Sequence, residues 1–448
     1  QDDIVHPELT VGEALRFYAD LRLPPDTEES ELSQRIEQTL DKLGLSGTEG
    51  TLIGSPDTAK GISGGQRKRV NLAMELLSDP QIIFLDEPTS GLSAVDTRMV
   101  MELLRRLAGE GKTIIITIHQ PSLQNYKLLD TVIILSFGKL AYYGPCHPES
   151  ILFFNNGLTN DELLSNPDNA LIGLHQAEID RGEYELDARS QRNEKGVYWQ
   201  QKYLASDFAS QYVRQRKGSH ELSDHAKAET SSYARQFVVL AHRFSVIKLK
   251  DRANTLILLA QAPLIGFMTG ILFSEEAYLG SAEALPGMAT MMFVLAISAI
   301  WFGNVNSCRE IVAEKAILHR ESKVGVGVVP YVYSKFIVLG ALCFLQTILL
   351  LGSVKVASGY SLGFGASFWS LFAIVFVTAM IGLSIGLVVS AIAKSQSQAL
   401  ALIPIVLLPM IIFGGGMMSV KQMADNENPF SYTFSMIMPT RWAVEEMV

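Results

Sequence analysis

The sequence predicts two folds in series: an α/β domain built on a parallel sheet, followed by an all-α domain that crosses a membrane several times. Charge is the first observation, because residues 254–448 hold only 9 Lys and Arg and 10 Asp and Glu, whereas residues 1–253 hold 28 and 36. Long uncharged runs in the second part are the second observation. Short apolar runs that alternate with helical patterns in the first part are the third. Together they exclude a wholly soluble enzyme, a disordered protein and a disulfide scaffold.

The first part of the chain alternates strand and helix patterns. Three short apolar runs predict β-strands: 81–85, 113–118 and 131–135. Helical patterns cover 66–77 and 95–108. Continuous apolar strands joined through helices indicate a parallel sheet that is buried on both faces. Ligands of such sheets bind at the carboxyl ends of strands, where Asp86, Glu87 and His119 are expected.

Several groups at these positions suit phosphate and metal chemistry, although each alone is a weak signal. The glycine turn at 62–66 opens a helix, and backbone N–H groups at a helix N-terminus suit a phosphate. Asp86 suits Mg²⁺ and Glu87 suits activation of a water, but an acidic pair is more often a helix cap or a solvated face. His119 could polarise a phosphate, and a lone histidine is more often structural. Gln1 could touch metal or water.

The second part contains five uncharged runs long enough to cross the hydrocarbon core as helices. The predicted spans are 253–274, 284–308, 336–354, 366–392 and 396–418. Pro404, Pro409 and the glycines at 414–416 predict that the fifth span is kinked and opens into a loop.

Loop charge predicts the orientation of these spans. The segment 309–335 carries five basic residues, while the loop 274–283 carries three Glu and no basic residue. The positive-inside rule therefore places the first segment in the cytosol and the second outside. Lys355 is an exception on the outer side that can extend to the interface. Five spans then leave 426–448 outside.

Charged segments connect the two parts. Residues 156–232 predict a cytosolic connector, and residues 233–252 an amphipathic helix at the cytosolic membrane surface. Residues 309–321, between the second and third spans, predict a further amphipathic helix. That helix either lies on the lipid surface or docks the soluble domain, and its charge pattern does not decide between the two.

The order and spacing of the motifs resemble the ATP-binding-cassette (ABC) transporters of the G subfamily, the White-type half-transporters, and their bacterial relatives. Ile62-Ser-Gly-Gly-Gln66 is similar to the ABC signature, and Ile82 to Asp86 is similar to Walker B. The stretch 117–122 (Thr-Ile-His-Gln-Pro-Ser) and Asn166-Pro-Asp168 are similar to G-subfamily sequence, and the resemblance covers essentially the whole chain. Further matches are Gln1 to the Q-loop glutamine and Gly91, Leu92 and Ser93 to the D-loop.

This resemblance implies a fold. Residues 1–155 would be an α/β P-loop-type nucleotide-binding domain, incomplete because it lacks a Walker A motif. Residues 253–448 would be an all-α polytopic membrane domain of the ABC-2 exporter fold. The segment 309–321 would be the coupling helix that docks the soluble domain, with Arg309, Glu310 and Glu314 on it.

The resemblance also implies roles for single residues. Glu87 would be the catalytic glutamate and His119 the switch histidine. Asp86 and Gln1 would hold Mg²⁺. The signature residues would contact the ATP that is bound by the partner chain of a dimer, and they are Ser63, Gly64, Gly65 and Gln66.

Two departures from the family pattern affect these expectations. The D-loop usually ends in Asp, and here that position is Ser93, so its part in communication across the dimer is open. Walker A is missing, because the sequence begins at the Q-loop glutamine. Gly111-Lys112-Thr113 only looks similar to it, since Arg106 stands where its first glycine should be and a strand follows. We expect a segment cut before Gln1 and before a sixth span, which alone does not hydrolyse ATP.

The expected function is export driven by ATP hydrolysis, with ATP and Mg²⁺ as cofactors and a second half-transporter, identical or different, as partner. An alternative is an ABC-type membrane ATPase that transmits force or signal without moving a substrate. The expected location is the plasma membrane, or the inner membrane of a bacterium, with the nucleotide-binding domain in the cytosol. The net charge of −9 argues against nucleic acid as a partner. Few ionisable residues in the spans permit a lipophilic or amphipathic cargo, whose identity stays open.

Overall fold

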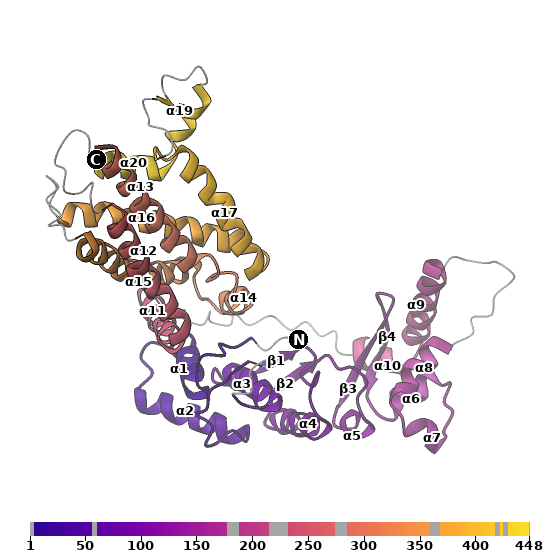
Figure 1. Cartoon of the computed structure of the whole chain (residues 1–448). Coiled ribbons are helices and arrows are strands. Elements are labelled where there is room, and N and C mark those ends of the chain that lie inside the picture. The colour runs from indigo at the N-terminus through magenta and orange to yellow at the C-terminus, as the bar shows by residue number, and fades with distance from the viewer. Residues whose placement is uncertain are drawn as a thin grey trace. The chain divides into compact units, whose positions relative to one another are not determined.

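A computed structural model of the chain describes residues 4–55, 61–176, 188–214, 232–273, 285–358, 368–416, 422–423 and 429–447. It contains two compact units (Figure 1). The first, called the sheet unit, comprises Gln1–Asp3, Ser33–Glu49 and Pro56–Ala228. The second, called the membrane unit, comprises Ile4–Leu32, Gly50–Ser55 and Glu229–Val448. The segment Ile4–Leu32, near the start of the chain, therefore belongs to the unit that holds the membrane helices.

The sheet unit contains the predicted parallel pair of strands. β1 (Ile82–Leu85) pairs with β2 (Thr113–Ile116) in parallel, so that Ile82 lies opposite Thr113 and Leu85 opposite Ile116. The connecting helix α4 (Ala94–Gly109) packs on β2, as a βαβ crossover requires. The prediction of an α/β pattern in this part of the chain is confirmed.

Two details of the predicted sheet are wrong for the described residues. β3 (Thr131–Ser136) pairs antiparallel with β4 (Lys139–Pro145) rather than joining the parallel pair. The reason is local, because Phe137 and Gly138 both have positive φ and form a two-residue turn that directs the chain back along β3. One face of the parallel pair is also uncovered, since the side chain of Phe84 is 73% exposed whereas Ile83 on the opposite face is buried.

The rest of the sheet unit packs around the β3–β4 hairpin. Trp199 and Tyr203 are buried against β4, and the Trp199 indole N–H donates to the Leu174 carbonyl at 2.9 Å. The predicted connector thus contributes helices to this unit. Besides α4, the sheet unit contains the helices α3 (Gly64–Leu76), α5 (Leu123–Tyr126), α6 (Glu149–Phe154), α7 (Asp161–Leu164), α8 (Asp168–Gln176), α9 (Ala188–Leu204), α10 (Asp207–Ala209) and the π-helix Ser210–Arg214.

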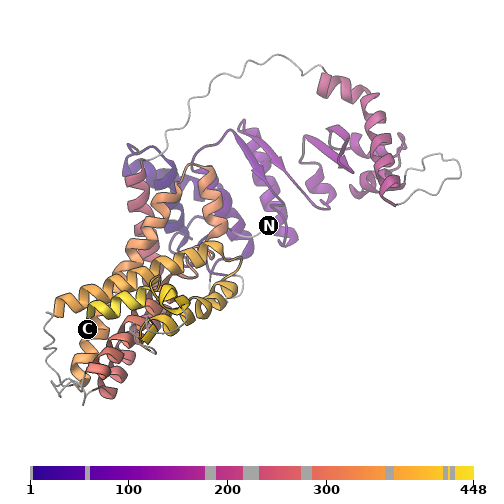
Figure 2. The same ribbon diagram turned by 90° about the horizontal axis from the view of Figure 1, so that it is seen from above.

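The membrane unit contains five helices that are long and apolar enough to cross a membrane, and they lie side by side (Figure 2). Each corresponds to one of the five predicted spans, with somewhat different ends. The third is longer than predicted at both ends, because Lys335 and Lys355 lie inside the helix although they end the uncharged run. The fifth ends before Gly414 and continues through both of its prolines. The helices are α12 (Arg252–Leu272), α13 (Leu285–Ser307), α15 (Val328–Ser358), α16 (Phe368–Ile392) and α17 (Gln396–Phe413).

Close backbone contact holds two pairs of these helices together. A Cβ atom at Gly270 of α12 would lie 2.6 Å from the Cβ of Ala357 and 2.8 Å from the Val354 carbonyl oxygen of α15. Gly303 of α13 and Gly382 of α16 meet in the same way. Small residues let membrane helices approach at van der Waals distance, which is a main source of association in lipid.

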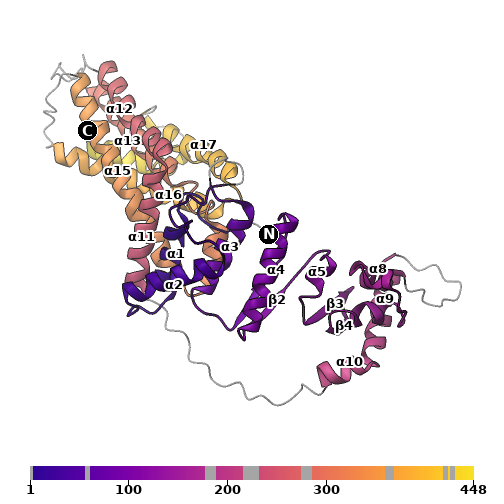
Figure 3. The same cartoon turned by 90° about the horizontal axis from the view of Figure 1, so that it is seen from below.

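A further group of helices packs at one end of the membrane unit. α1 (Val11–Arg22) lies beside α11 (Tyr233–Lys250), as Figures 1 and 3 both show. α2 (Glu29–Lys42) follows α1 in the chain. α11 also packs along α15. The amphipathic helix predicted over 233–252 is therefore a helix of almost the predicted length.

The helix predicted at 309–321 is displaced in the structure. Residues 308–314 form turns, and the helix α14 spans Lys315–Lys323. The N–H groups of Ile311 and Val312 both donate to Ser390 Oγ of α16, at 2.9 and 3.0 Å. These two bonds attach the turns before α14 to a neighbouring helix of the membrane unit.

The last described residues form two short helices, α19 (Pro429–Ser435) and α20 (Pro439–Met447). α20 packs against α13, α16 and α17, and Thr440 Oγ1 donates to the Met410 carbonyl at 2.9 Å. The loop 274–283 and residue Asn426, on which the predicted orientation depends, lie outside the described residues.

Candidate functional site

The predicted acidic pair lies where the two parallel strands end. Asp86 and Glu87 directly follow β1, and Thr117 directly follows β2. The N–H of Thr117 donates to the Leu85 carbonyl at 3.0 Å, which extends the parallel pairing by one residue. The carboxyl ends of both strands therefore meet at one edge of the sheet, as expected for a ligand site.

A single hydroxyl joins the members of the acidic pair. Thr117 Oγ1 donates to Asp86 Oδ1 at 2.6 Å and accepts from the N–H of Glu87 at 2.9 Å. Glu87 has φ of 46°, a left-handed conformation that is uncommon for a residue with a Cβ atom. Thr117 is not among the site residues predicted from the sequence. A hydroxyl residue directly after an apolar strand, in register with an acidic pair after the neighbouring strand, is the signal that could have found it.

His119 lies two residues beyond Thr117 and is exposed. Gln120, which follows it, has φ of 41°, so the chain turns sharply at the end of this strand. In the portions of the sheet unit that the structure describes, no hydrogen bond or ion pair joins His119 to Asp86 or Glu87. The histidine is at the predicted edge of the sheet, and its imidazole is open to a ligand.

The signature turn is organised by a capping box at the start of α3. The N–H of Gln66 donates to Ser63 Oγ at 3.2 Å, and the N–H of Ser63 donates to Gln66 Oε1 at 2.9 Å. Ser63 and Gly64 are exposed, so the first turn of the helix faces outward. A helix N-terminus with exposed backbone donors and small residues can bind an anion.

The D-loop residue that departs from the family pattern is a helix cap. Ser93 is the N-cap of α4, where its Oγ accepts from the N–H of Asp96 at 3.1 Å and donates to Asp96 Oδ2 at 2.7 Å. A serine serves this position about as well as an aspartate. Gly91 turns the chain before the cap with φ of 73°. Leu92, between them, is partly buried.

Asp96 also connects the D-loop to the signature turn. A Cβ atom at Gly65 would lie 2.6 Å from Asp96 Cγ and 3.1 Å from its Cβ, so a larger residue there would require the Asp96 side chain to shift. The second glycine of the signature therefore lies in close contact with Asp96 within the chain, in addition to any ligand it contacts.

The metal ligands predicted at this site are Asp86 and Gln1. Gln1 lies outside the described residues. Within those residues, no cluster of three or more His, Cys, Asp or Glu side chains could hold a metal ion. The donors still fit Mg²⁺, because that ion takes one or two carboxylates from a protein and fills its remaining positions with water and phosphate oxygens. Thr117 occupies one oxygen of Asp86 and leaves the other available.

The lysine in the Walker A look-alike is already engaged. The Lys112 ammonium pairs with Asp79 and donates to the Pro80 carbonyl at 3.1 Å. Gly111 turns the chain into β2 with φ of 96°. The segment is therefore a helix-to-strand connection, as predicted, whose lysine is tied to the loop before β1.

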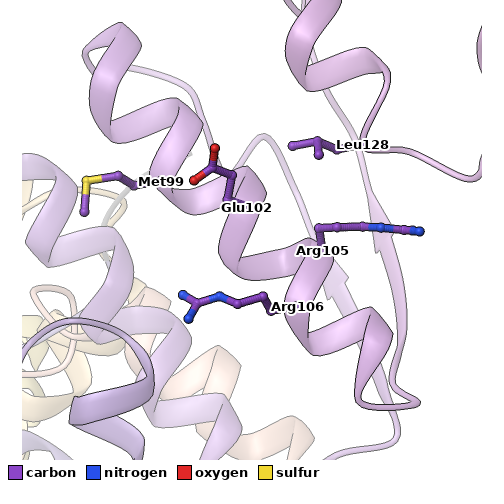
Figure 4. A pocket seen from close by; sticks show the side chains of 5 residues that line it. All are labelled: Met99, Glu102, Arg105, Arg106 and Leu128. Atoms are coloured by element: carbon purple, nitrogen blue, oxygen red, sulfur yellow. The ribbon is translucent and has the colours of Figure 1, made fainter.

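An open pocket of about 380 Å³ lies on the sheet unit away from these residues (Figure 4). Arg105 in its wall is paired with Asp130 at 2.7 Å. None of the predicted site residues lines this pocket, and its charged groups include both signs, so it does not alter the assignment of the site. Its lining residues are Met99, Glu102, Arg105, Arg106 and Leu128.

In the membrane unit, the predicted coupling segment forms ion pairs that are buried or partly buried. Glu314 pairs with Lys335 of α15 at 2.8 Å and accepts from the Tyr331 hydroxyl at 3.0 Å. Glu310 pairs with Lys248 of α11 at 2.6 Å. No ion pair of Arg309 is found in the described parts of the chain. Two of the three predicted coupling residues thus attach the segment to neighbouring helices.

His6, near the start of the chain, lies against the same ion pairs. Its Nδ1 lies 3.9 Å from Glu314 Oε1, and its Nε2 is buried without a hydrogen-bond partner. Burial lowers the pKa of His6 to about 4, and the positive charge of Arg243 adds to that effect. Burial alone would raise the pKa of Glu314, but Lys335, His6 and Arg243 outweigh it and bring the pKa to about 2. We call His6, Arg243, Glu314, Glu321 and Lys335 the buried ion cluster.

Apolar contacts support the same attachment. Leu21 of α1 packs with Leu240 of α11 and with Val326 and Tyr331 near the start of α15. Lys250 of α11 also forms an ion pair with Glu13 of α1. The segment from His6 to the end of α1 is therefore bound to α11 and to the start of α15 by both charge and apolar packing.

Two family models match the chain, and both describe transport proteins. A model described as ABC transporter matches residues 1–90, and a model described as ABC-2 type transporter matches residues 235–448. The first match includes the signature turn and the acidic pair. The second includes nearly all of α11, all five spans and the turns before α14.

Curated relatives match along nearly the whole chain. An ABC transporter ATP-binding/permease protein of Mycobacterium tuberculosis is 30% identical over 99% of this chain and 47% of its own length. The broad substrate specificity ATP-binding cassette transporter of Sus scrofa is 28% identical over 94% of the chain and 66% of its own length. ABC transporter G family member 7 of Arabidopsis thaliana is 29% identical over 93% and 57%. The chain spans about half to two thirds of the length of these relatives.

Proposed function

The chain belongs to the ABC transporters, as a half-transporter of the G type, and from this we propose that it takes part in the export of a substrate driven by ATP hydrolysis. The observation that carries the proposal is the edge of the sheet where Asp86, Glu87 and Thr117 meet, in a chain that also holds five membrane-crossing helices. Without the acidic pair at the strand ends, the helices would support only an unspecified membrane protein.

Each site residue takes a role that suits its placement. Asp86 would hold Mg²⁺, and the ion when bound would neutralise charge on the phosphates. Glu87 orients the attacking water and accepts its proton. His119 stabilises charge on the terminal phosphate. Phosphoryl transfer depends mainly on positioning and charge stabilisation, which such fixed groups supply.

The signature turn acts on a second copy of the nucleotide site. Ser63 and Gly64 are exposed at the start of α3, where backbone N–H groups point outward to an anion. We propose that this turn contacts the ATP held by a partner half-transporter, either identical or different. A closed dimer would therefore enclose two ATP molecules.

We propose that closure of the dimer is transmitted to the membrane helices through His6, Glu310 and Glu314. Glu310 and Glu314 are held by lysines of α11 and α15, and His6 lies against Glu314. A displacement of the segment after Gln1 is thereby passed to helices that enter the membrane. The described spans contain few ionisable side chains, which suits a lipophilic or amphipathic substrate.

The test is ATP-dependent uptake of lipophilic fluorescent compounds by sealed inverted vesicles that contain the full-length protein, together with its ATPase activity. Mg²⁺-dependent hydrolysis and uptake are expected, and Glu87→Gln is expected to abolish steady hydrolysis while ATP binding is retained. Uptake of the same compounds by vesicles with Glu87→Gln would contradict the proposal. Hydrolysis without transport of any compound would favour a membrane ATPase that transmits force or signal.

A further inference from the structure

We propose that Thr117 is a positioning residue of the ATPase site, whose hydroxyl orients the Asp86 carboxylate and fixes the backbone of Glu87. This inference rests on the proposed function and adds a residue to it. Its basis is the pair of hydrogen bonds that Thr117 Oγ1 makes, at 2.6 Å to Asp86 Oδ1 and at 2.9 Å from the N–H of Glu87.

The chemistry of the three groups fixes the direction of both bonds. A hydroxyl has one proton to donate and lone pairs that accept. An ionised carboxylate only accepts and a backbone N–H only donates, so Thr117 must give its proton to Asp86 and accept the proton of Glu87. The bond to Oδ1 also fixes the rotation of the carboxylate, and the other oxygen is left to bind a metal ion.

The second bond acts on the backbone that carries the proposed catalytic carboxylate. Glu87 has φ of 46°, and its carbonyl accepts from the N–H of Ser90 at 3.0 Å in the turn that follows. A left-handed residue at the end of a strand sets the direction in which its side chain leaves the sheet. The bond from its N–H to Thr117 holds this conformation against relaxation to a more common one.

A purely structural role accounts poorly for these contacts. Thr117 is exposed, so its side chain adds little to the packed core of the sheet unit. Its backbone N–H already donates to the Leu85 carbonyl, and any residue other than proline keeps that bond. What threonine adds is the hydroxyl, and both of its hydrogen bonds go to the acidic pair.

The experiment compares Thr117→Val, which keeps the shape and removes the hydroxyl, with Thr117→Ser, which keeps the hydroxyl. Three quantities are measured on the full-length protein: kcat for ATP hydrolysis, the Mg²⁺ concentration that gives half-maximal rate, and the affinity for ATP in EDTA. For valine we expect kcat to fall roughly 10- to 100-fold, the loss typical of a hydrogen bond to a charged group. We also expect a higher Mg²⁺ requirement and an unchanged affinity for ATP in EDTA. Serine should restore both kinetic values to within about twofold.

A valine variant with kcat and Mg²⁺ dependence within about twofold of the parent would overturn the proposal. So would a serine variant as impaired as valine, since the hydroxyl would then not be the active feature. Should the valine variant fail to fold, Thr117→Ala is compared with serine by the same three measurements. If the parent protein hydrolyses no ATP, the proposed function itself fails. A parent that is active and is abolished by Glu87→Gln, with valine unaffected, leaves the function standing and removes only Thr117.

Discussion

Arg243 and Glu321 form a two-point ion pair in which both side chains are nearly inaccessible to solvent. The guanidinium Nη1 and Nη2 donate to the two carboxylate oxygens at 2.6 and 2.9 Å, and the side chains are 6% and 2% exposed. Parallel hydrogen bonds of this kind fix the relative orientation of the two groups as well as their distance. The pair thereby fixes α14 against α11, which is the helix leading into the first span.

Removal of one partner of this pair is predicted to destabilise the protein strongly. Glu321→Gln leaves the Arg243 charge buried without its counter-ion, and breaking a buried pair in this way typically costs about 3–5 kcal/mol. The measurement is the midpoint of chemical unfolding of the protein in detergent, followed by the tryptophan signal.

The matched control for this prediction is the double variant Arg243→Leu with Glu321→Leu. Replacing both charges by apolar side chains removes the unpaired charge, so its loss of stability should be smaller than that of Glu321→Gln alone. A single variant as stable as the parent would show that the pair contributes nothing measurable.

Acidification is predicted to destabilise the membrane unit through His6. Its pKa is about 4 in the folded protein and about 6.5 when exposed, so the folded state binds the proton less well than the unfolded state. The contribution of neutral His6 is therefore fully present above pH 6.5 and is lost as the pH falls towards 4. This contribution of His6 to stability is on the order of 3 kcal/mol. Of the charged groups that face His6, Arg243 and Lys335 oppose its protonation, whereas Glu314 and Glu321 favour it.

The measurement for His6 is the unfolding midpoint between pH 7 and pH 4.5, a range that does not fall below the ordinary pKa of Glu314, 4.5. The control variant His6→Asn cannot take up a proton and should flatten this dependence. A parallel slope in the parent and in the variant would refute the assignment to His6. Below pH 4.5, Glu314 should add a second loss in both proteins, because its folded pKa is lowered to about 2.

The sequence predicts those features of this protein that depend on neighbours along the chain. Long uncharged runs mark the spans, and the apolar run that ends at Leu85 places Asp86 and Glu87 at the edge of the sheet. The predicted ends of a span are wrong where a charged residue remains helical. Lys335 is such a residue, and its charge is paired with Glu314 in the turns before α14. The start of the predicted helix at 309–321 also differs, since residues 308–314 form turns in which the N–H groups of Ile311 and Val312 donate to Ser390 of a distant helix.

The features that the sequence does not predict depend on partners far along the chain. Thr117 is 31 residues from Asp86, and Arg243 is 78 residues from Glu321. Neither pair has a characteristic spacing, so only the fold brings them together. The exposed face of Phe84 is a further case, because a continuous apolar strand indicates burial on both sides while the described residues cover one.

Enlargement of the second signature glycine is predicted to disturb the D-loop. Gly65→Ala places a Cβ atom within 2.6 Å of the Asp96 Cγ, so the carboxylate must move and loses its bond to Ser93. We expect at least a tenfold loss of ATPase activity, corresponding to about 1.4 kcal/mol. The measurement is a double-mutant cycle with Asp96→Ala, in which the Cβ no longer meets a carboxylate.

The cycle separates packing from ligand contact at Gly65. If packing is the cause, Gly65→Ala should cost less in the Asp96→Ala background than in the parent. Additive losses would instead show that the alanine acts only on the bound nucleotide. Either result is read from kcat and from the ATP concentration at half-maximal rate.

Substitution of Ser93, the D-loop residue that caps α4, is predicted to show how much its hydroxyl contributes to the stability of the sheet unit. Ser93→Ala removes the acceptor of the Asp96 N–H and should cost about 1 kcal/mol of stability in the sheet unit, the usual loss for a helix N-cap. Ser93→Asp supplies an acceptor of similar reach but brings a second carboxylate to within contact of Asp96, to which Ser93 now donates a hydrogen bond. The aspartate should therefore recover little of the stability unless Asp96 is also changed to Asn, because two like charges so close repel. Unfolding midpoints of Ser93→Ala, Ser93→Asp and Ser93→Asp with Asp96→Asn measure this order directly. A fully stable Ser93→Asp variant would show that Asp96 is free to turn away, and that the link from the D-loop to Gly65 is weaker than its geometry indicates.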